Sequence, residues 1–180
     1  MKLSHFLITF NQISVIFTLF ELNHSGEKTK IYSPLIEGED STLYEQFISE
    51  NEIKFKIEIV NIDQRLYTIG NDCGLFEEYF DTKAGKPAEN LCTFKDRPKK
   101  KLRMFFIEYG TKAMILGGGG HKATKFRSTQ DNPELYEKNR KIGEISIILQ
   151  KAERAGHFSV NSDGTLNSTT NFTYNSEDYE

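Results

Sequence analysis

The chain has 180 residues, of which 37% are hydrophobic and 27% charged, so it is long enough for one compact core and short for two. Ten of its 23 Lys and Arg residues lie between Lys95 and Arg127, where only two acidic residues oppose them. This segment therefore carries +8, which leaves −11 for the rest of a chain whose formal net charge is −3. A concentrated positive field favours a phosphate-bearing partner, and the alternative is a plain solvated surface.

Cysteine usage and the start of the chain indicate the compartment. Cys73 and Cys92 stand alone, without a C-x-x-C pattern or clustered histidines, which argues against a disulfide framework and a zinc site. The run from Phe6 to Phe20 resembles a signal peptide, but polar residues interrupt it and no small-x-small pattern follows. It is also too short and too polar to span a bilayer, so we expect cytoplasmic localisation and no membrane segment.

The first predicted elements are a hairpin and a helix. Residues 13–22 and 28–32 are rich in β-branched and aromatic residues and flank an Asn-His-Ser-Gly turn, which predicts a β-hairpin. Pro34 and Gly38 are expected to break the chain. Thr42 and Glu45 then have the spacing of a capping box, which predicts a short helix over about residues 41–49.

The next stretch is ambiguous between strand and helix. Residues 53–60 alternate like a strand, whereas the apolar residues from Ile59 to Ile69 keep helical spacing and end at Gly70, a natural C′ residue. We favour the helix. A second short helix is expected over residues 74–80, with Leu75, Phe76, Tyr79 and Phe80 in the core, followed by a loop over residues 83–87.

A β-meander is predicted in the basic segment. Residues 102–107 and 114–116 are strand-like and flank a turn at 109–112, and residues 121–127 are expected to form a third strand after four consecutive glycines. A tight corner with a close backbone approach or a bulge is the favoured role for these glycines over a phosphate cradle.

The longest predicted helix follows. Asn132 as N-cap and Pro133 at N1 begin it, and Gly156 should end it after Ala155. Its apolar stripe predicts burial of Leu135, Ile142, Ile145, Leu149 and Ala152, while Glu134/Lys138 and Glu137/Lys141 form pairs on the outer face. The polar residues 157–180 are expected to be a mobile tail, apart from a turn over 161–164.

Catalytic motifs of the usual kinds are absent from the sequence, which contains no Walker motif, no G-x-S-x-G and no H-E-x-x-H. His121 could serve as a general acid or base, or it could be a solvated loop histidine. Arg103, in an otherwise apolar strand, could bind phosphate or could bury its stem and expose its head.

The residues of this segment also resemble a known family. Residues 101–116, with Leu102-Arg103 opening a hydrophobic strand, and the following Gly-Gly-His-Lys-Ala-Thr-Lys of residues 119–125 are similar to the core of RelE-like toxins, particularly their phage-derived branch. The resemblance covers about residues 70–155. It departs from the family pattern at Ala123, where a second lysine is usual, in the four-glycine run, and in the long helix and tail that follow.

The resemblance implies a helical hairpin packed on a small antiparallel sheet. It also implies a toxin of a toxin-antitoxin module that cleaves mRNA, usually at the ribosome, and is inhibited by a cognate antitoxin. By position, Arg103 matches the family's strand arginine and Lys122 the lysine after the second strand, with Lys125 a looser match.

We therefore expect an α+β fold with a small antiparallel meander flanked by helices. The expected organisation is an N-terminal hairpin extension over residues 1–38, a RelE-like core over 39–156 and the mobile tail over 157–180. The expected function is that of a metal-independent endoribonuclease, an mRNA interferase without a cofactor, whose partners are RNA or the ribosome and an antitoxin. The alternatives are a non-catalytic RNA- or protein-binding module from a phage or mobile element and an inert structural domain.

In the catalytic hypothesis a ribose 2′-OH attacks the adjacent phosphorus in line. Arg103 and Lys122 would stabilise the charge on the phosphoryl oxygens, and His121 or Tyr109 would transfer the proton. The residues expected to bind RNA are Lys99, Lys100, Lys101, Lys125 and Arg127.

Overall fold

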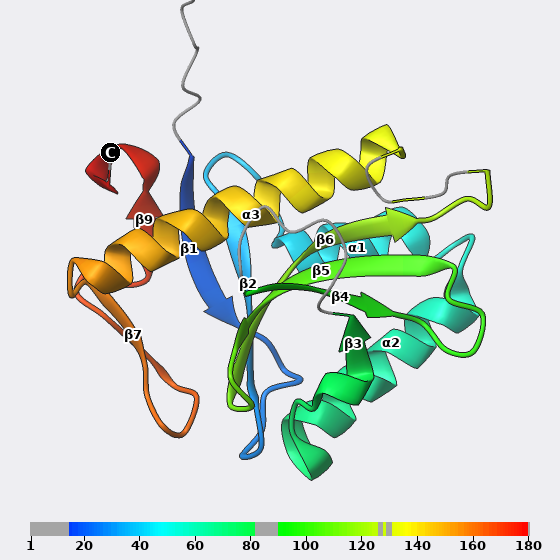
Figure 1. The fold of residues 1–180 in the computed structure, drawn as a ribbon, viewed down its shortest axis with the longest axis horizontal. Coiled ribbons are helices and arrows are strands. Elements are labelled where there is room, and N and C mark those ends of the chain that lie inside the picture. The colour runs from blue at the N-terminus through cyan, green and yellow to red at the C-terminus, as the bar shows by residue number, and fades with distance from the viewer. Residues whose placement is uncertain (1–14, 82–89, 126–127, 129–130, 180) are drawn as a thin grey trace, which may run out of the picture.

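The computed structural model describes residues 15–81, 90–125, 128 and 131–179, which form an α+β fold around one central sheet. The strands of this sheet are β1 (Ile16–Glu21), β2 (Lys30–Ile36), β3 (Phe80–Asp81), β4 (Leu91–Lys95), β5 (Leu102–Tyr109), β6 (Ala113–His121) and β9 (Thr173–Asn175). Their order is β3-β4-β5-β6-β2-β1-β9. The helices are α1 (Leu43–Asn51), α2 (Lys56–Thr68) and α3 (Pro133–Arg154), and a separate hairpin contains β7 (Phe158–Val160) and β8 (Leu166–Ser168) (Figure 1).

Helices cover both faces of the sheet. The long helix α3 lies across one face, and α1 and α2 pack on the other (Figure 1). One buried cluster joins α3 to the sheet through residues such as Phe105, Ile115 and Ile145. A second cluster joins α1 and α2 to the opposite face through residues such as Phe47, Ile62 and Phe106. The expected sheet flanked by helices is confirmed.

The N-terminal hairpin is confirmed, but the sheet is mixed and not purely antiparallel. β1 pairs antiparallel with β2 from Phe17↔Ile36 to Glu21↔Tyr32. β2 also pairs parallel with β6, from Lys30↔Ala113 to Tyr32↔Ile115. The expected break at Pro34 is wrong, because Pro34 lies within β2 opposite Leu19. Proline is tolerated there because the pairing of β2 with β6 ends at Tyr32, so its missing N–H removes no hydrogen bond to β6.

Helix α1 begins where the capping box predicts. The Thr42 side chain accepts a hydrogen bond from the Glu45 backbone N–H at 3.3 Å, and the Glu45 carboxylate accepts one from the Thr42 N–H at 2.7 Å. These two bonds satisfy donors that the first turn of a helix leaves free.

The helix favoured for the ambiguous stretch is confirmed as α2, although its end differs from the prediction. The chain continues through a π-helical turn, Ile69–Cys73, and reverses at Gly74, whose φ is 87°. Gly70 is needed for a close approach instead, because a Cβ there would lie 1.9 Å from the His24 carbonyl oxygen. The helix expected over residues 74–80 is only a 3-10 turn, Glu77–Tyr79, and Phe76 is exposed.

The central meander is confirmed for two of its strands and corrected for the third. β6 continues without interruption through the four glycines and ends at His121, and residues 122–125 form no strand. The expected strand over 121–127 is therefore wrong up to Lys125, and Phe126 and Arg127 lie outside the described residues, as does the loop expected over 83–87. β4, which pairs antiparallel with β5, was not predicted, because it is short and its partner lies beyond a loop.

The four glycines form a bulge inside a strand, not a corner. Met104 pairs with Gly119 and Phe106 with Leu116, so two residues of β6 face one residue of β5. A Cβ on Gly117 would lie 2.7 Å from Cγ1 of Ile142 in α3, and one on Gly119 would lie 2.0 Å from the Arg103 carbonyl oxygen. Both predicted roles of the glycines, a close backbone approach and a bulge, are therefore confirmed, and only the corner is wrong.

Helix α3 has the predicted bounds and buried stripe. Asn132 is its N-cap, accepting a hydrogen bond from the Leu135 N–H, and the helix ends at Arg154 with Ala155 as C-cap. Its outer face differs from the expected pairing. The Lys138 ammonium donates to both carboxylate oxygens of Glu50 in α1, at 2.8 and 2.9 Å. The stem of Lys138 passes over Gly118, so this ion pair connects the helices on the two faces of the sheet.

The C-terminal residues form ordered elements, so the expectation of a mobile tail is wrong. β9 pairs antiparallel with β1, and the buried Tyr174 ring stacks on Phe17 with ring centroids 5.4 Å apart. Phe158 of β7 is buried edge-on against the Tyr174 ring. A few large aromatic residues therefore anchor a segment whose composition is mostly polar. The predicted turn over 161–164 is confirmed by the Gly164 N–H bond to the Asn161 carbonyl.

Candidate functional site

The predicted basic residues meet at one end of the sheet. The β4–β5 loop carries Lys99, Lys100 and Lys101, and the chain leaving β6 carries Lys122 and Lys125. Leu102 pairs with His121, and the Lys122 N–H donates to the Lys101 carbonyl at 2.9 Å, so the two stretches lie side by side. We call the surface formed by Lys54, Lys99, Lys100, Lys101, Lys122 and Lys125 the basic end.

The β4–β5 loop is held closed by hydrogen bonds between side chains and main-chain groups. Asp96 is buried and accepts a hydrogen bond from the Leu102 N–H at 2.6 Å. The Arg103 guanidinium donates to the Lys100 carbonyl at 2.8 Å and to the Leu102 carbonyl at 3.3 Å. Lys99 and Lys100 are left exposed at the tip of the loop.

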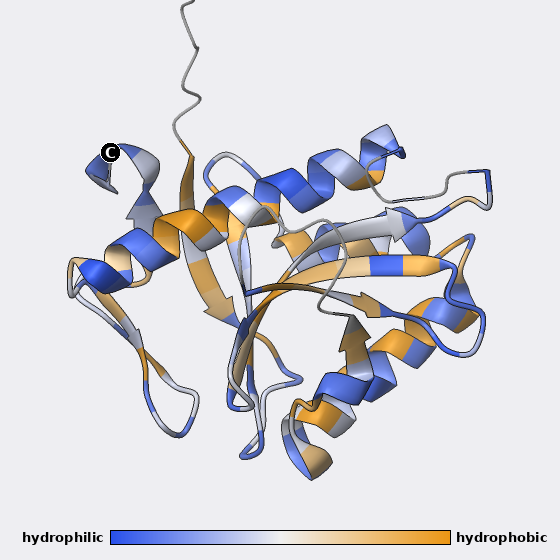
Figure 2. Cartoon of the chain, in the orientation of Figure 1, coloured by the Kyte–Doolittle hydropathy of each residue, from blue (hydrophilic) through white to orange (hydrophobic). Residues whose placement is uncertain are grey.

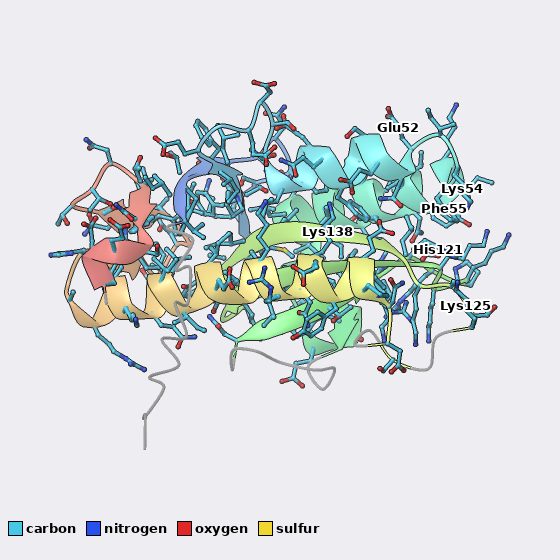
Figure 3. The ribbon with its side chains drawn as sticks, turned by 90° about the horizontal axis from the view of Figure 1, so that it is seen from above. Glu52, Lys54, Phe55, His121, Lys125 and Lys138 are labelled. Atoms are coloured by element: carbon cyan, nitrogen blue, oxygen red, sulfur yellow. The ribbon has the colours of Figure 1, made fainter. Side chains whose placement is uncertain are left out.

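The His121 ring packs against an aromatic ring from the turn between α1 and α2. It lies 4.7 Å from the ring of Phe55, with the two planes inclined by 32°. Phe55 is the N-cap residue of α2 and is buried. The ammonium groups of Lys54 and Lys101 lie 5.4 and 5.9 Å from the Phe55 ring centroid. Figure 3 shows Lys54, Phe55, His121 and Lys125 gathered at the same end of the molecule.

The surroundings of His121 favour its neutral form. Partial burial lowers the pKa of the imidazole below its ordinary value of 6.5, and the positive charges of Lys54 and Lys101 lower it further. Glu134, at the start of α3, acts in the opposite direction. At neutral pH the ring is therefore a proton acceptor.

Lys101 has a structural partner. Its ammonium lies 2.6 Å from a carboxylate oxygen of Glu58, which is buried in the first turns of α2. The hydrogen bond from Lys101 is the largest of the causes that lower the pKa of Glu58. Lys101 thus neutralises a buried carboxylate, and its charge is less available to a ligand than those of Lys99 and Lys100.

Arg103 and His121 lie on opposite faces of the sheet. Leu102, the partner of His121, packs in the buried cluster that contains Phe55, on the α2 side. Arg103 pairs with Gly120, and a Cβ on Gly120 would approach Glu134 and Leu135 of α3. The two residues are therefore separated by the strands themselves.

Tyr109 lies at the far end of β5 from His121. It pairs with Ala113 at the β5–β6 turn, roughly 20 Å along the strand from Leu102. Its ring packs edge-on against Phe158, and burial raises the pKa of its hydroxyl well above the ordinary value. The structure does not bring Tyr109 to the basic end, and Arg127, the remaining residue of the predicted site, lies outside the described residues.

Two members of the site, Lys54 and Phe55, were not predicted. They belong to the turn between α1 and α2, more than 60 positions before His121 in the sequence. The available signal was local: Lys54-Phe55-Lys56 interleaves basic and aromatic residues, a pattern suited to nucleic acid.

The described part of the chain contains no cluster of three or more His, Cys, Asp and Glu side chains able to hold a metal ion. Within the same ranges, none of the helices is both long and apolar enough to cross a bilayer.

The chain was also compared with known proteins. No protein-family model, no curated protein and no solved structure matches it significantly.

Proposed function

We propose that the protein binds single-stranded RNA at its basic end and cleaves it without a metal ion, as a toxin-like mRNA interferase related to the RelE-like toxins. The observation that carries the proposal is the half-buried His121 ring, packed against Phe55 and placed among lysines from three separate parts of the chain. The resemblance of residues 101–125 to the toxin core supports the assignment of Lys122. In this proposal the RNA is translated mRNA at the ribosome, and an antitoxin is the inhibitor.

The lysines would bind the RNA backbone. Lys54, Lys99, Lys100 and Lys125 are exposed, and Lys122 is half-buried beside His121. Neutralising several phosphates releases counterions and supplies affinity that does not depend on sequence. The half-buried His121 ring, held by Phe55, would give an unpaired base a surface on which to stack.

The chemistry then needs one proton acceptor and one positive charge. Neutral His121 takes the proton of the ribose 2′-OH while that oxygen bonds to the adjacent phosphorus, and the bond to the 5′ oxygen breaks. The imidazolium returns a proton to the leaving 5′ oxygen, so the products are a 2′,3′-cyclic phosphate and a 5′-hydroxyl. Lys122 stabilises the charge on the phosphoryl oxygens. Arg103, which bonds two main-chain carbonyls, holds the loop that carries Lys99 and Lys100.

A non-catalytic RNA-binding module is the second candidate. The observation in its favour is that Arg103 and His121 lie on opposite faces and that Tyr109 lies at the far end of β5. In that case the basic end binds RNA and no strand scission follows.

The two candidates separate in a cleavage assay on mRNA, run with ribosomes in magnesium buffer and, in a second arm, without ribosomes in the presence of EDTA. The wild-type protein is expected to produce 2′,3′-cyclic ends, and His121→Gln and Lys122→Ala are each expected to slow cleavage by about a hundredfold. Lys112→Ala, at the opposite end of β6, is the control and should leave the rate unchanged.

The pH dependence of the same rate tests the role of His121. Because its pKa is lowered, the rate should hold from neutral pH down to below 6.5 and fall only as the imidazole becomes protonated. Lys54→Met removes one cause of the lowering and should move the acid limb to higher pH. Undiminished cleavage by a folded His121→Gln variant contradicts the catalytic assignment, and RNA binding without cleavage by the wild type establishes the second candidate.

A further inference from the structure

The outer side of α2 is apolar and exposed. Ile57 is 78% exposed, Val60 45% and Tyr67 56%, and Ile53 in the preceding turn is 93% exposed. At 3.6 residues per turn, the three helical residues lie within an arc of roughly 80° on the side opposite the buried face. That buried face contains Ile59, Ile62 and Leu66. Figure 2 shows hydrophobic residues along the whole length of α2, at the edge of the molecule.

The spacing of the exposed residues fits another helix. Ile57, Val60, Gln64 and Tyr67 are separated by three, four and three positions, which is the a/d pattern of a coiled-coil seam. Gln64 supplies the kind of polar seam residue that fixes register at some cost in stability. Single exposed apolar residues are common on protein surfaces. A row of them at helical spacing, on a helix that already packs its other side in the core, indicates a docking surface.

The charges beside this seam are complementary to those of a second copy. Lys56 and Asp63 are both exposed, lie seven positions apart and therefore occupy the same flank of the seam. In an antiparallel helix pair, residues of this flank face each other, whereas in a parallel pair they face the other flank, where Asn61 and Thr68 lie. An antiparallel pair whose centre lies at the level between residues 59 and 60 places each Lys56 at the level of Asp63 of the other copy.

The two ends of the helix also differ in charge. Its N-terminal end lies at the basic end, with Lys54 and Lys56 exposed, and its C-terminal end is followed by exposed Asp72, Glu77 and Glu78. One oxygen of Asp63 lies 2.6 Å from Nε2 of His24, and the carboxylate as a whole is about half exposed. It is thus held in place and remains accessible.

We propose that α2 is a dimerisation helix, on which two copies of this chain pack antiparallel through the Ile57, Val60 and Gln64 seam. In this register only residues 56–63 of the two α2 helices overlap, so the interface is small and the dimer is expected to be reversible, with a dissociation constant on the order of micromolar or weaker. The inference is independent of RNA cleavage.

Sedimentation equilibrium of the full chain, from low micromolar to near-millimolar concentration, tests the proposal. The wild-type protein is expected to show a monomer–dimer equilibrium, and Ile57→Lys should raise the dissociation constant by at least about tenfold. Ile147→Lys is the matched control, because Ile147 is an exposed apolar residue of α3 away from the seam, and it should change the constant less than twofold. A wild-type protein that stays monomeric, or a dimer that Ile57→Lys leaves intact, overturns the proposal.

A charge exchange tests the antiparallel arrangement. Lys56→Glu and Asp63→Lys should each weaken self-association, because like charges then meet across the seam twice. Mixing the two variants should restore a heterodimer, because both contacts become opposite in sign. Failure of two folded variants to associate on mixing overturns the arrangement. If Asp63→Lys does not fold because the His24 contact is lost, the Ile57→Lys comparison still decides whether the seam is the interface.

Discussion

Replacing Gly119 with alanine is expected to destabilise the protein by more than about 3 kcal/mol. The added Cβ would lie 2.0 Å from the Arg103 carbonyl oxygen and 2.7 Å from the Met104 Cα. Both atoms belong to the backbone of β5, so no rotamer change can relieve the contact, and the two strands would have to separate at the bulge. Urea denaturation of the purified variant measures the loss.

Gly120→Ala is the matched control for this substitution. Its nearest neighbours would be the Glu134 carboxylate at 3.4 Å and a Leu135 methyl group at 3.5 Å, both ends of side chains. The change should cost less than about 1 kcal/mol, since the alanine also restricts the unfolded chain. Equal destabilisation by the two variants contradicts the bulge as described.

Ile145→Asp is expected to be the most damaging substitution in α3, at about 4 kcal/mol or more. Ile145 is completely buried between α3 and the sheet, so the aspartate would leave a cavity and a carboxylate without a partner. Ile147, two positions along the same helix, is 41% exposed. Ile147→Asp should cost less than about 1 kcal/mol, mainly through helix propensity. The reverse ranking in urea melts contradicts the packing of α3 on the sheet.

The sequence predicts α1 and α3 well because their signals are local. The Thr42 capping box, the Asn132-Pro133 start and the apolar stripe of α3 each lie within one element. The parallel pairing of β2 with β6 and the docking of β9 on β1 depend on contacts between distant parts of the chain, and no local pattern encodes them. For the same reason a polar C-terminal segment was expected to be mobile, although Tyr174 anchors it.

The residues of the candidate site also differ in whether the sequence alone can group them. The lysines of the β4–β5 loop and of residues 122–125 could be grouped from the sequence, because they lie in one basic segment. Lys54 and Phe55 come from the α1–α2 turn and join the site only through the fold. The register of β5 with β6, together with the bulge, decides that His121 and Arg103 lie on opposite faces. The glycine run indicates a bulge, but the sequence does not give its position in the register.

The most direct test of RNA binding at the basic end is the salt dependence of the dissociation constant for a single-stranded RNA, measured by fluorescence anisotropy. The triple variant Lys99→Gln, Lys100→Gln and Lys125→Gln should bind at least tenfold more weakly at low salt, and the slope of log affinity against log salt should become shallower by about two. The control Lys112→Gln, Lys151→Gln and Arg154→Gln removes the same charge from exposed residues away from the basic end and should keep the wild-type slope. Identical slopes for the wild type and both triple variants, or wild-type binding that does not change with salt, contradict the proposal.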